Sequence, residues 1–165
     1  MTDQAPTDSP ALQDLNDVVD AHVGRLRAVL EYGLTLKRVL DGASDTDFGV
    51  QSWAPLAEFV DTARFDRVGN FKDLMDWDEY VAFLTRWASG ATWECSFKRV
   101  TETSGLVFLE LEERTVTDGV ASAANSLSVY AFDPDDRIVH IDVYLQMPLP
   151  RAFLPAIYQD VRLSD

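Results

Sequence analysis

The second half of the chain alternates apolar and polar residues, and this pattern constrains the fold more than any other feature. The alternation appears in residues 92–100, 107–114, 127–130 and 139–146. A period of two is typical of strands that bury one face. Turn residues at 103–105 and 133–136 separate neighbouring stretches, and small residues fill 118–124. The pattern therefore predicts four antiparallel strands, with a turn, a loop from Asp118 to Ala124 and a hairpin between them.

The first half shows helical spacing instead. Apolar residues recur every three or four positions from residue 11 to residue 42, which predicts a long amphipathic helix. Gly24 and Gly33 fall inside it, and glycine disfavours a helix interior, so we expect a break or a close packing contact there. Residues 53–60 predict a second, short helix.

A short strand and a third helix complete the first half. The strand is expected within residues 64–72. Asp76 is the expected N-cap of the third helix, with Glu79 in position to complete a capping box. Its apolar stripe comprises Tyr80, Phe83, Leu84 and Trp87.

Helices followed by hairpin-linked strands predict an α+β fold. We expect a curved antiparallel sheet covered by three helices, forming a cone whose open end admits a small molecule. The aliphatic side of each strand should face the helices, including Leu127 and Val129 of the third strand. Residues 1–10 are expected to be a flexible tail, and residues 11–165 a single domain.

Charge and composition exclude several classes of partner. The chain has 28 acidic and 14 basic residues and a net charge of −14, which disfavours binding to nucleic acid. No apolar run is long enough to span a membrane. The first ten residues lack the basic and apolar regions of a secretory signal, so a cytoplasmic protein is expected.

The residues that commonly hold cofactors are scarce. Cys95 is the only cysteine, and His22 and His140 lie far apart, so neither a disulfide nor a metal site is expected. Burial between Trp93 and Phe97 favours an inert thiol. Glycine-rich nucleotide-binding motifs and nucleophile elbows are absent from the sequence. We therefore expect any chemistry to proceed without a cofactor.

Three stretches resemble the SnoaL-like branch of the nuclear transport factor 2-like superfamily: FVDTARFDRVGN, MDWDEYVAFLTRWA and SLSVYAFDPDDRIVHIDVYLQ. With the first helix, the resemblance covers roughly residues 11–147. It implies the cone fold and a homodimer formed through the sheet. The superfamily contains isomerases, cyclases, epoxide hydrolases, dehydratases and non-catalytic binding modules, so the resemblance does not select one function.

The sequence departs from the catalytic patterns of these families. Relatives of limonene epoxide hydrolase pair an arginine with two aspartates, and here Arg114 is followed two positions later by Val116. On the last strand Val143 occupies the aspartate position, while Asp142 is one residue early and should face the other side. The base of the steroid isomerases would fall near Arg67 or Val68, neither of which can accept a proton.

The dehydratase pattern requires two pocket histidines, and the sheet region contains only His140. The Arg64, Asp66 and Arg67 cluster before the third helix is better explained as a structural ion pair than as a site.

The candidate site lies where the inner face of the sheet reaches the open end of the cone. Glu113 continues the Val107–Leu111 face and is the candidate catalytic acid or base. Tyr32 and Asn125 are candidate hydrogen-bond partners, with Trp53 and Trp93 as further lining residues. The alternative is that these are rim and core residues with no chemical role.

A second cluster follows the polar side of the strands: Lys98, Glu110, Glu112, Arg114, His140 and Asp142. Arg114 and Asp142 would be pocket residues if this side bounded a cavity. A solvated or dimer-forming outer face with ion pairs is the favoured interpretation, because the aliphatic side should lie under the helices.

Two functions remain open. The first is binding of a small, mainly apolar molecule with cofactor-independent isomerisation, cyclisation or hydration. The second is a non-catalytic ligand-binding or dimerisation module with a closed, aromatic-filled core.

Overall fold

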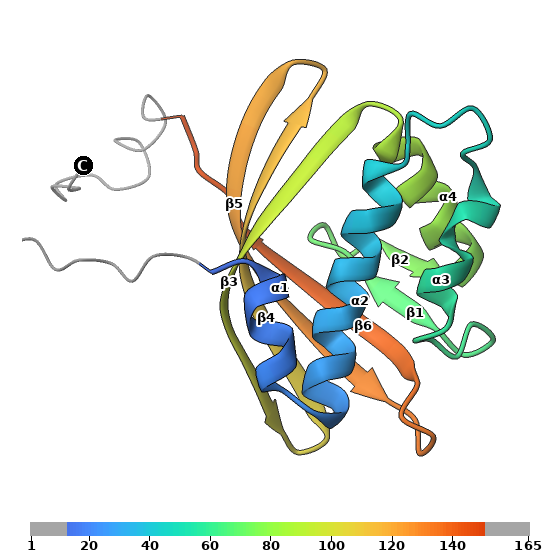
Figure 1. Ribbon diagram of the computed structural model, residues 1–165, viewed down its shortest axis with the longest axis vertical. Helices are drawn as coiled ribbons and strands as arrows, with labels where there is room; N and C mark the ends of the chain where they lie inside the picture. The colour runs from blue at the N-terminus through green and yellow to red at the C-terminus, as the bar shows by residue number, and fades with distance from the viewer. Residues whose placement is uncertain (1–12, 151–165) are drawn as a thin grey trace, which may run out of the picture.

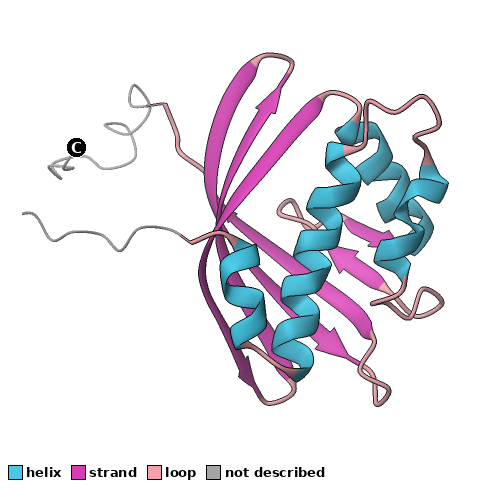
Figure 2. Ribbon diagram, in the orientation of Figure 1, coloured by secondary structure: helices cyan, strands magenta, loops and turns pink. Residues whose placement is uncertain are grey.

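The computed structural model describes residues 13–150, which form a strongly curved sheet with the helices on its concave side (Figures 1 and 2). The sheet has six strands in the order β2-β1-β6-β5-β4-β3. The strands are β1 Asp66–Val68, β2 Leu74–Asp76, β3 Ala91–Thr103, β4 Leu106–Thr117, β5 Val120–Phe132 and β6 Ile138–Gln146. The predicted α+β fold with a curved sheet is confirmed.

One pairing makes the sheet mixed. The β3–β4, β4–β5, β5–β6 and β1–β2 pairs are antiparallel, as in a chain of hairpins. β1 instead runs parallel to β6, with Arg67 opposite Ile141. This pairing attaches the β1–β2 hairpin, from the first half of the chain, to the last strand.

The helices are α1 Leu15–Val18, α2 Gly24–Asp41, α3 Ala54–Ala57 and α4 Trp77–Ala88, with 3-10 helices η1 Val19–Ala21 and η2 Val50–Trp53. The single long helix expected from residue 11 is therefore interrupted at Gly24, whose φ of +61° suits glycine. Gly33 continues α2, and a Cβ there would lie 3.2 Å from Cδ1 of Leu15. The break and the close contact expected at the two glycines are both present.

The start of α4 matches its predicted capping box. The side chain of Asp76 accepts from the backbone N–H of Glu79, and the Glu79 carboxylate accepts from the backbone N–H of Asp76. Tyr80 and Leu84 of the expected apolar stripe are buried in the structure. The cap fixes where α4 begins and so which residues it presents to the sheet.

Two strand boundaries differ from the sequence prediction. The loop expected from Asp118 to Ala124 is only the turn Asp118-Gly119, because both residues adopt positive φ and close a tight hairpin. β5 therefore begins at Val120. β2 was not predicted, because Leu74 and Asp76 are exposed and the strand lacks a buried face.

The inner face of β5 is the reverse of the one predicted. Ser126 and Tyr130 are buried, whereas Leu127 and Val129 are half-buried on the outer face. The register decides this, since Ser126 lies opposite Leu111 of the buried β4 face and Ser128 lies opposite Leu109. Residues that face each other across a pair share one side of the sheet, so the aliphatic residues of β5 point outward.

The expected tail at residues 1–10 and the segment after Pro150 lie outside the described residues. Among residues 13–150, no helix has both the length and the apolar character needed to cross a membrane.

We predict that replacing Gly24 with alanine lowers the free energy of unfolding by about 1 kcal/mol. A Cβ at this position meets no atom within 4 Å, so the effect should come from the backbone conformation alone. Urea denaturation measures it. Gly24→Asn is the matched control. Its free energy of unfolding should fall by less than that of the alanine variant, because asparagine tolerates positive φ. An alanine variant as stable as the parent would contradict this explanation.

Candidate functional site

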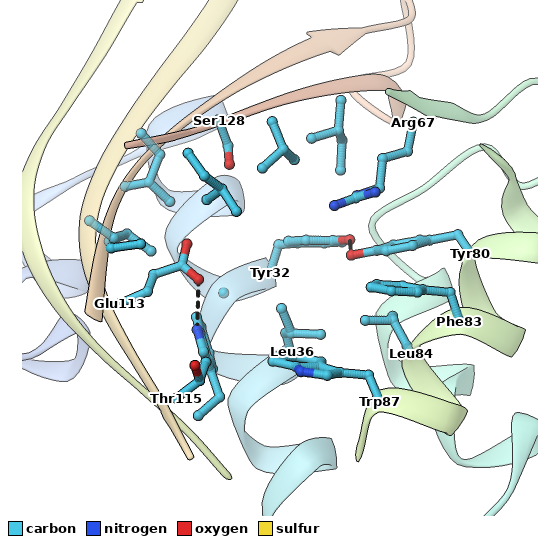
Figure 3. A pocket seen from close by; sticks show the side chains of 18 of the residues that line it. Tyr32, Leu36, Arg67, Tyr80, Phe83, Leu84, Trp87, Glu113, Thr115 and Ser128 are labelled. Carbon is cyan, nitrogen blue, oxygen red and sulfur yellow. Dashed lines mark hydrogen bonds between the residues drawn. The ribbon is translucent and has the colours of Figure 1, made fainter. Parts of the chain in front are cut away.

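A cavity of about 290 Å³ lies between the concave face of the sheet and helices α2 and α4 (Figure 3). The β4, β5 and β6 strands form one wall, and aromatic and leucine side chains of α2 and α4 form the other. The volume is at the low end of the range for small-molecule sites. The lining is mostly apolar. Its polar groups come from Glu113, Arg67, three tyrosines (Tyr32, Tyr80 and Tyr130) and three hydroxyl residues (Thr115, Ser122 and Ser128).

The small residues of β5 explain why this space is not filled. Ala124 lies opposite Glu113, and Ser126 and Ser128 lie opposite Leu111 and Leu109. These short side chains run between the longer ones of β4 and β6. Leucine or valine in place of Ala124 or Ser128, which line the cavity, would extend into it.

Glu113 is held by a tryptophan. The Nε1–H of buried Trp93 donates to Oε2 of Glu113 at 2.9 Å. This bond is the dashed line at Glu113 in Figure 3, and the other carboxylate oxygen faces the cavity. Glu113 is half-buried at the inner end of the β4 apolar face. A carboxylate fixed at one oxygen and open at the other is suited to proton transfer.

Two tyrosine hydroxyls meet at the centre of the site. Tyr32 of α2 donates to the hydroxyl of Tyr80 of α4 at 3.2 Å, and both side chains are buried. Burial raises the pKa of Tyr32 and of Tyr80, so both remain protonated at neutral pH. Because the pair shares one hydrogen bond, one phenolic proton remains available to a further acceptor.

Arg67 is the site residue that the sequence reasoning missed. It lies opposite Ile141 on the inner face of the sheet, and its guanidinium is 5.2 Å from the ring centre of Tyr80 and 5.6 Å from that of Phe83. The structural ion pairs expected for Arg64, Asp66 and Arg67 are present, but each residue pairs outside this group. Arg64 pairs with Asp61 and Asp133, and Asp66 contacts His140. The signal available in the sequence was Phe65, two residues earlier and also buried.

Tyr32, Trp93 and Glu113 thus line the cavity as expected, although their roles remain predictions. Trp53 does not line it. Its side chain is buried in the core, where Nε1 donates to the hydroxyl of Thr85 at 2.9 Å. The expectation that Trp53 stands at the mouth is wrong, because η2 turns its indole into the space beside α4.

Asn125 lies on the outer face, which corrects its predicted role. Its side chain accepts from Lys98 and donates to Gln146. The cause is the reversed face of β5, since Asn125 has the same orientation as Leu127. It cannot hydrogen-bond a ligand in the cavity.

Arg114 and Asp142 also lie on the outer face. Arg114 donates to Glu112 and Ser96, one position along the strand from inward-facing Glu113. Asp142 contacts Nε2 of His140 at 3.1 Å. They are therefore not pocket residues, and the ion-paired outer face favoured by the sequence is the one observed.

Cys95 contributes no reactive thiolate. Burial, followed by the nearby charge of Glu113, raises the pKa of its thiol to about 12. Among residues 13–150, no group of three or more potential ligands is arranged to hold a metal ion.

The sequence matches no protein-family model, and no curated protein is significantly similar to it. Solved structures do match. An NTF2-like protein of unknown function from Cytophaga hutchinsonii has a TM-score of 0.53 at 12% identity, covering 83% of this chain and 97% of its own. The resemblance inferred from the sequence is therefore confirmed for the fold. The chain has the NTF2-like fold.

Two further similar structures carry names that suggest chemistry. A putative SnoaL-like polyketide cyclase from Jannaschia has a TM-score of 0.54 at 13% identity, with 76% of this chain and 90% of that chain covered. An epoxide hydrolase/cyclase-like enzyme of pyran ring formation in salinomycin has a TM-score of 0.53 at 16% identity, with 74% and 91% covered.

The outer face yields a pH prediction. His140 of β6 contacts Asp66 of β1 through Nδ1 and Asp142 through Nε2. Partial burial lowers the pKa of His140, but the two carboxylates outweigh this effect and the net pKa is raised above 6.5. The ion pairs therefore stabilise the folded state below about pH 6.5 and lose that effect as the pH rises through the folded-state pKa.

We expect the His140→Gln variant to have a lower free energy of unfolding than the parent at low pH, by less than about 1 kcal/mol. At high pH the difference should be smaller still. Chemical denaturation at a series of pH values measures the difference. Introducing Asp142→Asn into both the parent and the His140→Gln variant should reduce the pH dependence of the stability difference between them. An NMR titration placing His140 at or below its ordinary pKa would disprove the assignment.

Proposed function

We propose that the protein binds a small, mainly apolar molecule in this cavity and catalyses proton transfer on it without a cofactor. The observation that carries the proposal is Glu113, a carboxylate fixed by Trp93 and open to an otherwise largely apolar space. Isomerisation, cyclisation and hydration all require such a group.

The chemistry is simplest for a ketone. Glu113 removes a proton from the carbon beside the carbonyl, and the electron pair of that C–H bond moves to the oxygen to give an enolate. The phenolic proton left free by the Tyr32–Tyr80 hydrogen bond supplies a donor for the developing negative charge. Glu113 then returns its proton to another carbon of the enolate. Alternatively, the enolate carbon attacks a second carbonyl to close a ring, and Glu113 gives its proton to the oxygen of that carbonyl.

The neighbours support this class of reaction through their names, a putative polyketide cyclase and an epoxide hydrolase/cyclase-like enzyme. Epoxide hydrolysis by an arginine and two aspartates is disfavoured for this chain. Arg114 and Asp142 face outward, and β6 presents only aliphatic residues, such as Ile141 and Val143, to the cavity.

Non-catalytic ligand binding is the alternative, and the aliphatic face of β6 favours it. A module of this kind would retain the cavity but use Glu113 only to hold Trp93. Measuring turnover in a Glu113 variant separates the two functions.

We predict that the protein accelerates exchange of the α-protons of 2-tetralone with deuterium, measured by NMR. This bicyclic ketone is small, apolar and free of charge. Glu113→Gln should slow the catalysed exchange by about 100-fold or more, since an amide cannot accept the proton. Glutamine can still accept the bond from Trp93, so folding should be preserved.

Glu112→Gln is the matched control. Glu112 precedes Glu113 on β4 but pairs with Arg114 on the outer face, so its removal should leave the exchange rate unchanged. Equal exchange rates for Glu113→Gln and the parent would refute the acid–base role and favour the binding module.

We further propose a homodimer through the outer face of the sheet. Two apolar cross-strand pairs lie there. Phe108 pairs with Val129, and Leu127 pairs with Tyr144. Tyr144 is exposed and the other three are half-buried. An apolar patch among ion pairs is typical of an interface.

Light scattering after size exclusion should give about twice the chain mass of 18.5 kDa. Tyr144→Lys should shift the mass toward the monomer, because it places a charge in the patch. A monomeric parent protein at micromolar concentration would contradict the proposal.

A further inference from the structure

Arg67 has a positive charge that the described part of the protein does not fully pair. Its side chain is only 13% exposed. Within residues 13–150 its one ion pair is with Asp73, at 3.7 Å, and no hydrogen bond joins it to another residue. A buried guanidinium is normally held by close, often bidentate, hydrogen bonds to an anion.

Asp73 does not meet this requirement. A separation of 3.7 Å is too long for a hydrogen bond, so Asp73 contributes charge attraction alone. Asp73 also accepts from the backbone N–H of Phe71, within the loop between β1 and β2. The guanidinium is supported mainly by the rings of Tyr80 and Phe83, which leave its N–H edge open.

The open edge points into the cavity. Figure 3 shows the guanidinium of Arg67 directed inward beside the hydroxyls of Tyr32 and Tyr80. The tyrosine pair retains one phenolic proton after its mutual hydrogen bond. This end of the cavity is therefore rich in donors, and Glu113 lies apart from it in the same view.

We infer that the ligand carries a carboxylate, bound by Arg67, with an apolar body extending along β4 and β6 toward Glu113. The free proton of the tyrosine pair then remains for the enolate oxygen. The inference rests on the proposed function and narrows its substrate to small, mainly apolar carboxylic acids. A carboxylate is planar and accepts two parallel bonds from a guanidinium.

A phosphate fits less well. It carries up to two charges, and the cavity already contains the Glu113 carboxylate in a chain of net charge −14. The single charge of Arg67 balances one carboxylate.

The test compares two probes of the same shape, 2-naphthoate and 2-naphthamide, by isothermal titration calorimetry with the full chain. The parent protein should bind the carboxylate about tenfold or more tightly than the amide. Arg67→Gln should abolish the preference. Arg114→Gln removes the same charge from the outer face and should retain it, which controls for long-range electrostatics.

Equal affinity of the parent for both probes would overturn the carboxylate assignment while leaving an apolar cavity in place. A preference that survives in Arg67→Gln would overturn the role of Arg67. If circular dichroism shows that this variant does not fold, Arg67→Lys replaces it, and it should reduce the preference because lysine lacks the planar fork.

The two proposals fail separately. Glu113→Gln should retain the preference for naphthoate, since it removes a negative charge from the cavity and leaves Arg67 intact. Exchange of 2-tetralone without a carboxylate preference would support the acid–base role and reject this inference. Binding of neither probe at millimolar concentration would reject both the cavity and its carboxylate site.

Discussion

The site depends on a row of small side chains in the middle of the sheet. Along β5, Ala124, Ser126 and Ser128 face the helices between the aliphatic faces of β4 and β6. Packing normally eliminates empty space, because each unfilled volume forfeits contacts. Here Tyr32 of α2 contacts Tyr130 of β5, whereas Ala124 and Ser128 of the same strand line the open space. The curvature of the sheet and the short side chains of β5 together leave the cavity.

The polar groups around this space share one arrangement. Glu113 is bound by Trp93 at one oxygen, Tyr32 is bound by Tyr80, and Arg67 lies on aromatic rings. In each case the protein orients the group but leaves part of its hydrogen-bonding capacity directed at the cavity. Such partial satisfaction is costly in a closed core, and it is what a preorganised ligand site requires.

Much of the fold follows from local patterns, whereas the site follows from them only in part. Alternation placed Leu109, Leu111 and Glu113 on the correct face, and the Asp76 capping box placed α4. The same rule failed on β5, because it assumes that the apolar side of a strand is the buried side. A strand that borders a cavity can reverse this relation, and nothing local to residues 120–132 reveals that its serines face inward. Only the register with β4 does so.

Arg67 was missed for a related reason, since β1 has only three residues and gives too little alternation to assign a face. Its position depends on the parallel pairing with β6, which no local pattern predicts. Two neighbouring residues of β1 point to opposite faces of the sheet. Asp66 contacts His140 on the outside, while Arg67 enters the cavity opposite Ile141. The same three-residue strand therefore carries an outer ion pair on one face and the positive charge of the cavity on the other.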